Sequence, residues 1–223
     1  MSFILPVSLL LMRTRVKICG ITRPADGRAA AEAGADAIGL VFYAQSPRCV
    51  DLPRAQEICR VLPPFVSVVA LFVDAQRDQV EEVLSTVPVD ALQFHGGESA
   101  AQCAGFGRPY IKAVGMQPGL DLHAVMQSHP EACGFLLDAW QPGTHGGGGI
   151  AFDWSQMPAG TARPLILAGG LTADSVAEAI TLTRPFAVDV SSGVELEKGI
   201  KSTEKMQAFI RGVEVGDASK ANR

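Results

Sequence analysis

The sequence contains no cluster of basic residues and few charged residues of any kind. Only 19% of its 223 residues are charged, and acidic side chains outnumber basic ones by 23 to 19. A nucleic-acid-binding surface needs Lys and Arg gathered on one face, and a net charge of -4 gives no sign of such a surface. We therefore expect no nucleic-acid partner.

The sequence also lacks the cysteine patterns of disulfide-rich and zinc-binding proteins. Its five cysteines are odd in number, and none of them are spaced as CxxC. The histidines do not group with Asp or Glu at the spacing of metal ligands. We expect no metal site and a cytoplasmic location, where thiols stay reduced.

No apolar run is long enough to cross a bilayer, so we expect no membrane partner. The first stretch, MSFILPVSLLLM (1–12), has no basic residue before its apolar run and no small-residue cleavage site after it. We interpret residues 1–11 as a non-native or disordered extension and Met12 as the natural start. An export signal is the alternative.

What the sequence does contain is apolar material, 48% of all residues, arranged as short runs that each precede an amphipathic stretch. This alternation is typical of parallel strands joined by helices. The predicted strands are 15–20, 37–42, 66–73, 91–95, 110–115, 134–139, 165–170 and 186–192. The predicted helices are 23–34, 52–62, 76–87, 98–105, 119–129, 172–183 and 202–213.

Eight such units predict an α/β fold, a single-domain (β/α)8 TIM barrel over residues 12–213. An open doubly wound sheet is the alternative, because a sequence does not show closure. The sixth connection contains the run HGGGG (145–149) and leaves room for one helical turn at most, in DWSQMP (153–158). We expect residues 214–223 to be a polar, frayed tail.

In such a barrel the active site lies at the carboxyl ends of the strands. Cys19, Asp138 and Asp189 all lie at or near predicted strand ends. A carboxylate at the end of an apolar strand must be solvated, paired or functional, whereas a buried cysteine is often only a small apolar side chain. We expect these residues to meet at one mouth of the barrel, where they are candidates for acid and base chemistry.

Other residues at the same ends are candidates for binding. Arg48 suits a carboxylate ligand, or is a surface arginine, and His95 binds substrate or caps a strand. Glycine-rich loops after the last strands let backbone N–H groups approach a phosphate. Tight strand-to-helix turns are the better explanation when each loop is taken alone, but three such loops in adjacent positions favour phosphate. The candidates for phosphate are Gly147, Gly148, Gly149, Gly169, Gly170, Ser191, Ser192 and Gly193.

Eight motifs in order make the chain closely similar to the phosphoribosylanthranilate isomerase family of tryptophan biosynthesis over residues 15–213. They are KICGIT (17–22), GLVFYAQSPRCV (39–50), LFVD (71–74), LQFHG (92–96), LLDA (136–139), GGGGIAFDW (146–154), LAGGL (167–171) and VDVSSGVE (188–195). This resemblance implies a barrel enzyme that rearranges N-(5-phosphoribosyl)anthranilate without a cofactor, as a monomer or homodimer.

The resemblance also implies roles for the candidates. Asp138 would be the general acid and Cys19 the general base, while Arg48, His95 and Asp189 would bind the carboxylate and the ribose. The glycine-rich loops would hold the phosphate. One departure is Gly148, where the family usually has Thr or Ser.

The implied Amadori rearrangement explains why an acid and a base are needed. The acid protonates the furanose ring oxygen, and the base removes a proton from the second ribose carbon. We expect a raised pKa for Asp138 and, for Cys19, a pKa lowered from about 8.5 toward neutrality. The alternatives are a histidine-pathway isomerase, which would want Asp in place of Cys19, and a non-catalytic phosphate-binding barrel.

Overall fold

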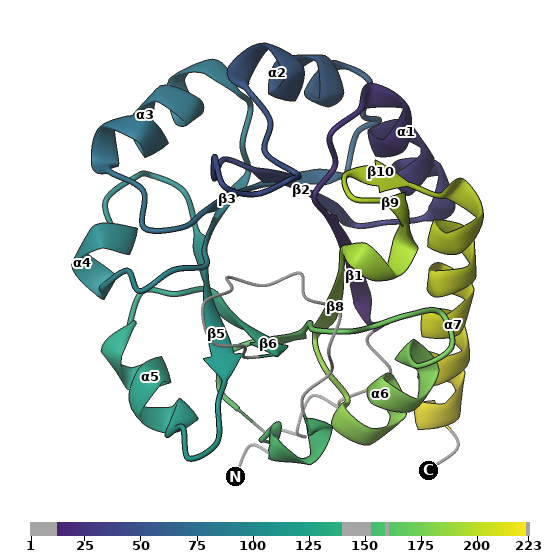
Figure 1. Cartoon of the computed structure of the whole chain (residues 1–223). Helices are drawn as coiled ribbons and strands as arrows, with labels where there is room; N and C mark the ends of the chain where they lie inside the picture. The colour runs from purple at the N-terminus through teal and green to yellow at the C-terminus, as the bar shows by residue number, and fades with distance from the viewer. Residues whose placement is uncertain (1–12, 140–152, 159–160, 222–223) are drawn as a thin grey trace, which may run out of the picture.

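The eight predicted strands form a closed parallel barrel (Figure 1). The computed structural model describes residues 13–139, 153–158 and 161–221. β8 pairs with β1 and closes the ring, which confirms the barrel and excludes the open sheet. The strands are β1 (Arg15–Cys19), β2 (Ala37–Val41), β3 (Ser67–Phe72), β4 (Ala91–Phe94), β5 (Tyr110–Met116), β6 (Gly134–Ala139), β7 (Leu165–Leu167) and β8 (Ala187–Val190).

Helices surround the ring on its outer side (Figure 1). They are α1 (Pro24–Ala33), α2 (Leu52–Arg60), α3 (Arg77–Thr86), α4 (Ala100–Cys103), α5 (Leu122–Ser128), α6 (Val176–Thr183) and α7 (Thr203–Ala221). In the described parts of the sixth connection, residues 153–158 and 161–164, the only helical segment is the short 3-10 turn η1 (Trp154–Gln156), at the place predicted for one turn. None of the described helices is long and apolar enough to cross a membrane.

Two strands are shorter than predicted because the backbone turns early. β7 ends at Leu167, and Gly169 and Gly170 then adopt φ angles of 80° and 65°, which extended strands do not contain. β8 ends at Val190 and leads into the 3-10 turn η2 (Ser192–Val194). A small antiparallel hairpin follows, β9 (Glu195–Glu197) and β10 (Ile200–Lys201), which the sequence pattern did not predict.

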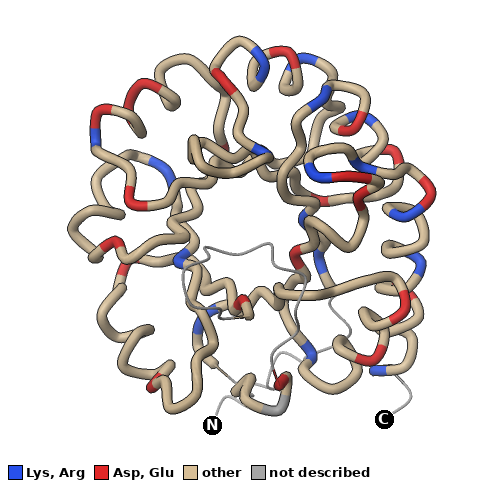
Figure 2. Tube along the Cα trace, viewed as in Figure 1, with Lys and Arg blue, Asp and Glu red and all other residues tan. Residues whose placement is uncertain are grey.

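The largest apolar core lies between the strands and the helices. Ile18, Leu40, Phe72 and Phe135 are fully buried there. The barrel interior holds two smaller clusters of mostly small or branched side chains, one of which includes Cys19. Most charged positions lie on the surrounding helices and loops (Figure 2), so the few charges inside the barrel stand out.

The chain end differs from prediction. Residues 214–221 continue α7 instead of forming a frayed tail. The Asp217 carboxylate accepts hydrogen bonds of 2.7 and 2.6 Å from the backbone N and the hydroxyl of Thr14, which fixes α7 to the start of β1. Gly212 and Gly216, one turn apart, lie so close to α6 that a Cβ on Gly216 would be 2.9 Å from the Cβ of Ile180.

We expect Asp217→Ala to lower the free energy of unfolding by about 1–2 kcal/mol, because two hydrogen bonds to Thr14 are lost. Burial raises the pKa of Asp217, but hydrogen bonds from Lys220 and Thr14 outweigh it and lower the pKa below 3.8. The stabilisation is therefore complete above the ordinary pKa and lost as pH falls through the lowered one.

Urea unfolding of the wild type and of Asp217→Ala at neutral and acid pH measures this difference. Glu214→Ala, at an exposed position on the same helix, is the control and should change stability little. A difference between wild type and Asp217→Ala that grows as the pH falls would contradict the assignment.

Candidate active site

β1 presents two polar side chains to the barrel interior. Lys17 and Cys19 are two residues apart and share a face, while Ile18 between them packs toward the helices. The strand register sets Lys17 opposite Asp189 on β8, and its Nζ lies 2.7 Å from Asp189 Oδ1. Both side chains are buried, so each charge compensates the other.

The Cys19 thiol fits beside a glycine of the neighbouring strand. Gly39 pairs with Cys19 in the register, and a Cβ at Gly39 would lie 2.7 Å from Sγ. Burial raises the pKa of the Cys19 thiol, and the nearby ammonium groups of Lys17 and Lys201 lower it only partly, so the net shift is upward. The lowered pKa expected from sequence is therefore wrong for this structure, because the thiol is desolvated.

Asp138 on β6 and His95, the residue directly after β4, meet inside the mouth of the barrel. Asp138 Oδ1 accepts a 2.8 Å hydrogen bond from the backbone N of Ala139, and Oδ2 lies 3.2 Å from His95 Nε2. Both side chains are nearly buried, at 10% and 12% exposure. β5 runs between the two strands and offers only Ala113 and Gly115 near this height, which leaves space for the contact.

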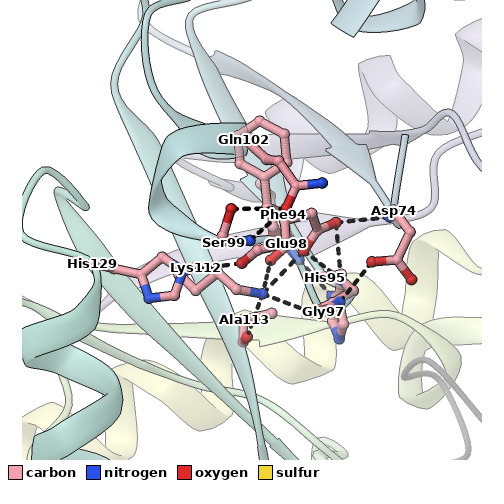
Figure 3. A network of polar contacts seen from close by, with 12 residues as sticks. Asp74, Phe94, His95, Gly97, Glu98, Ser99, Gln102, Lys112, Ala113 and His129 are labelled. Carbon is pink, nitrogen blue, oxygen red and sulfur yellow. Dashed lines mark hydrogen bonds and ion pairs between the residues drawn. The ribbon is translucent and has the colours of Figure 1, made fainter. Parts of the chain in front are cut away.

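The loop that carries His95 is held by a buried ion pair (Figure 3). The Glu98 carboxylate accepts a 2.9 Å hydrogen bond from the backbone N of Gly96 and lies 3.1 Å from Lys112 Nζ. Lys112 also donates to the carbonyl groups of Phe94 and Gly96, at 3.3 and 2.7 Å. The backbone on both sides of His95 is thereby fixed.

Arg48 lies on the loop after β2, as expected, but one edge of its guanidinium is already occupied. Its Nε and Nη2 each donate a 2.8 Å hydrogen bond to a different oxygen of Glu195. Lys201 Nζ lies 2.8 Å from the same carboxylate. Burial alone would raise the pKa of Glu195, but Arg48 and Lys201 lower it. Glu195 therefore stays ionised and orients Arg48.

The loops after β7 and β8 bring the expected phosphate-binding residues together. A Cβ on Gly169 would lie 2.6 Å from the backbone N of Ala139, and one on Gly193 would lie 2.0 Å from the carbonyl oxygen of Leu171. Ser191 precedes the 3-10 turn η2, and Ser192 and Gly193 lie in it. Gly147, Gly148 and Gly149 lie outside the described residues.

The structure thus gathers Cys19, Asp138, Asp189, His95 and Arg48 at the carboxyl ends of the strands. Sequence reasoning missed a second set of polar residues. Of these, Lys17 could have been found, because a period of two places it on the same face as Cys19. Lys112 lies on the side of β5 opposite the barrel interior and Glu98 lies in the loop after β4, and neither gave a signal. The missed residues are Lys17, Gln93, Glu98, Lys112, Glu195 and Lys201.

The described residues offer no cluster of metal ligands. Within residues 13–139, 153–158 and 161–221, no three His, Cys, Asp or Glu side chains are grouped so as to hold a metal ion. The polar groups of the mouth are a thiol, carboxylates, an imidazole and paired cations. Such groups can move protons and bind an anionic ligand.

Comparison with known proteins finds relatives from one enzyme family. A family model of N-(5'phosphoribosyl)anthranilate (PRA) isomerase matches residues 16–212. The N-(5'-phosphoribosyl)anthranilate isomerase of Pseudomonas paraeruginosa is 58% identical over 199 residues, which are 89% of this chain and 94% of the relative.

Solved structures of isomerases with this name have a similar fold. The phosphoribosyl anthranilate isomerase of Thermotoga maritima has a TM-score of 0.83 at 39% identity, covering 90% of this chain and 98% of that one. A second isomerase structure, in complex with reduced 1-(o-carboxyphenylamino)-1-deoxyribulose 5-phosphate, has a TM-score of 0.78 at 37% identity with the same coverage.

The raised pKa of Cys19 predicts how its thiol reacts. Because only the thiolate is nucleophilic, we expect alkylation by iodoacetamide to be slow at neutral pH and to keep accelerating into the alkaline range. Peptide mass spectrometry of timed samples measures the rate at Cys19. The exposed Cys49 in the same samples serves as an internal control. A Cys19 rate that is already maximal at neutral pH would refute the raised pKa.

Proposed function

The chain belongs to the N-(5'-phosphoribosyl)anthranilate isomerase family, and we propose that Asp138 and Cys19 act in it as general acid and general base. The enzyme converts N-(5'-phosphoribosyl)anthranilate to 1-(2-carboxyphenylamino)-1-deoxyribulose 5-phosphate in tryptophan biosynthesis. One observation carries the proposed roles: a buried thiol on β1 and a buried carboxylate on β6 face the same mouth of the barrel.

The first step is proton delivery by Asp138. Its Oδ1 is occupied by the backbone N of Ala139, so Oδ2 is the oxygen that carries the proton. The proton passes to the furanose ring oxygen as the bond between that oxygen and the first ribose carbon breaks. The electron pair of that bond goes to the oxygen, and the lone pair of the anthranilate nitrogen forms a C=N bond, giving an open-chain iminium.

The second step is proton removal by Cys19. The thiolate takes the proton from the second ribose carbon, and the electrons of that C–H bond form a C=C bond while the C=N pair returns to nitrogen. The resulting enolamine becomes the ketone when its hydroxyl proton moves to the first carbon. Burial raises the pKa of Cys19. The positive charges of Lys17 and Lys201 act in the opposite direction and support the thiolate.

The remaining site residues hold the substrate in this scheme. The Nη1 of Arg48 makes no hydrogen bond with the described residues and is directed to the anthranilate carboxylate, while Glu195 holds the other edge of the guanidinium. His95 and Asp189 bind the ribose. The phosphate lies against the backbone N–H groups of Gly169, Gly170 and Ser191 to Gly193.

We also propose that the reaction takes place in the cytoplasm. All five cysteines are free, which suits the reducing cytoplasm. The substrate is a small phosphorylated molecule, and the chemistry uses its own nitrogen as electron sink, so the scheme needs no cofactor. We propose that the enzyme is a monomer or a homodimer.

Cys19→Ala and Asp138→Asn should each reduce kcat by about 100-fold or more, the usual contribution of a general acid or base. Loss of substrate fluorescence after addition of purified protein measures turnover. Cys133→Ala, at an exposed position before β6 and at the other end of that strand from Asp138, and Asp78→Asn, at an exposed position on α3, are matched controls that should retain it. Near-normal turnover in either site variant, with an unchanged circular dichroism spectrum, would remove that residue from the scheme.

Arg48→Gln should raise KM about tenfold or more while changing kcat less, because a charge-assisted hydrogen bond to the substrate is lost from ground and transition states alike. The exposed Arg54, which pairs with Glu57 on α2, supplies the control Arg54→Gln. Steady-state kinetics give both constants. An unchanged KM in folded Arg48→Gln protein would reject the carboxylate assignment.

A further inference from the structure

A buried amide lies behind the histidine that contacts the proposed acid. Gln93 is on β4, is fully buried, and points into the barrel on the same face as His95. Its Nε2 lies 2.9 Å from His95 Nδ1, and His95 Nε2 lies 3.2 Å from Asp138 Oδ2. The three side chains form one line of polar contacts across β4 and β6.

We propose that Gln93 is a positioning residue: its amide donates to His95 Nδ1 and so keeps the ring hydrogen of His95 on Nε2, from which His95 donates to the Asp138 carboxylate that proton delivery leaves behind. This rests on the proposed role of Asp138. Gln93 itself is assigned no contact with the substrate.

The chemistry of the imidazole ring sets the rule. A neutral imidazole has one N–H donor and one lone pair, so the partner of Nδ1 determines what Nε2 offers to Asp138. When the Gln93 amide donates from Nε2, His95 Nδ1 accepts and His95 Nε2 donates to the Asp138 carboxylate. When the amide accepts through Oε1, Nδ1 donates and Nε2 accepts the proton of an uncharged Asp138.

In the structure the amide nitrogen of Gln93 faces His95 Nδ1. Gln93 Oε1 is buried and has no hydrogen-bond partner among the described residues, so the contact with His95 is the one hydrogen bond that this side chain makes with them. A leucine could not donate to Nδ1, and an ionised carboxylate could only accept from it.

The groups around His95 are fixed, so its ring keeps the same contacts while Asp138 loses and regains its proton. The backbone N of His95 donates a 2.8 Å hydrogen bond to Phe72 O, and Lys112 binds the carbonyl groups on both sides of His95 (Figure 3). Asp138 Oδ1 is held by Ala139. The acid and carboxylate forms of Asp138 differ by one proton, which Asp138 gives to the furanose oxygen and regains from water, while the ring hydrogen of His95 stays on Nε2.

The test reads the His95 tautomer and turnover separately. Long-range ¹H–¹⁵N NMR distinguishes the two ring nitrogens, and a His95→Gln variant identifies the His95 signals among the four histidines. In the wild type we expect one tautomer to predominate. Gln93→Leu should give a mixture of tautomers and a kcat lower by about tenfold, part of an acid's contribution, with KM changed less than about twofold.

Gln93→Glu keeps a polar side chain and covers the case in which Gln93→Leu fails to fold. An ionised carboxylate only accepts, so it should shift the hydrogen of His95 to Nδ1, and kcat should fall as well. The control is Gln127→Leu, because Gln127 Nε2 contacts His123 Nε2 at 2.8 Å on the exposed face of α5. That variant should leave both the His95 spectrum and kcat unchanged.

The outcomes separate this inference from the proposed acid. Equal tautomer populations in the wild type, or folded Gln93 variants with an unaltered His95 spectrum or unaltered kcat, would overturn the inference while Asp138→Asn still reported on the acid. Conversely, full turnover in Asp138→Asn would reject the acid and the catalytic part of the inference. The tautomer shift in the Gln93 variants would then show a structural effect only.

Discussion

The closure of eight parallel strands into a ring is the constraint on which the rest of this protein depends. In each strand alternate residues point inward, and because all strands run the same way, their inward residues at the carboxyl ends share one mouth. Cys19 on β1 and Asp138 on β6 are far apart in sequence but face this common space. The helices bury the outward residues, which makes the ring rigid enough to hold the site.

Charged groups can occupy this interior only where they are paired. An unpaired charge taken out of water costs several kcal/mol, so a buried ion needs a partner with good geometry. Lys17 pairs with Asp189, and Glu195 lies between Arg48 and Lys201. These pairs also set the electrostatics of the thiol: the ammonium groups act against its desolvation but do not overcome it. The same pairing that makes the interior stable limits how acidic Cys19 becomes.

Glycines provide the space that these side chains need. Gly39 leaves room for the thiol, Gly169 lets the loop after β7 approach Asp138, and Gly193 brings the loop after β8 against Leu171. Gly115, opposite Asp138 in the register, has no side chain to separate Asp138 from His95. Adding a Cβ at Gly39, Gly169 or Gly193 would place atoms closer than van der Waals contact allows. The site therefore needs glycine at each of these positions.

Local patterns predict the eight barrel strands, the order of the helices, the helical turn within residues 153–158 and the strand ends where Cys19, Asp138 and Asp189 lie, because periodicity and turn residues are local properties. They did not reveal that α7 continues to Ala221, since this depends on Asp217 reaching Thr14 from the other end of the chain. The meeting of the polar groups depends on contacts between strands that are far apart in the chain. Gln93 beside His95, Arg48 beside Glu195 and the desolvation of Cys19 all arise from closure of the barrel, which no local pattern encodes.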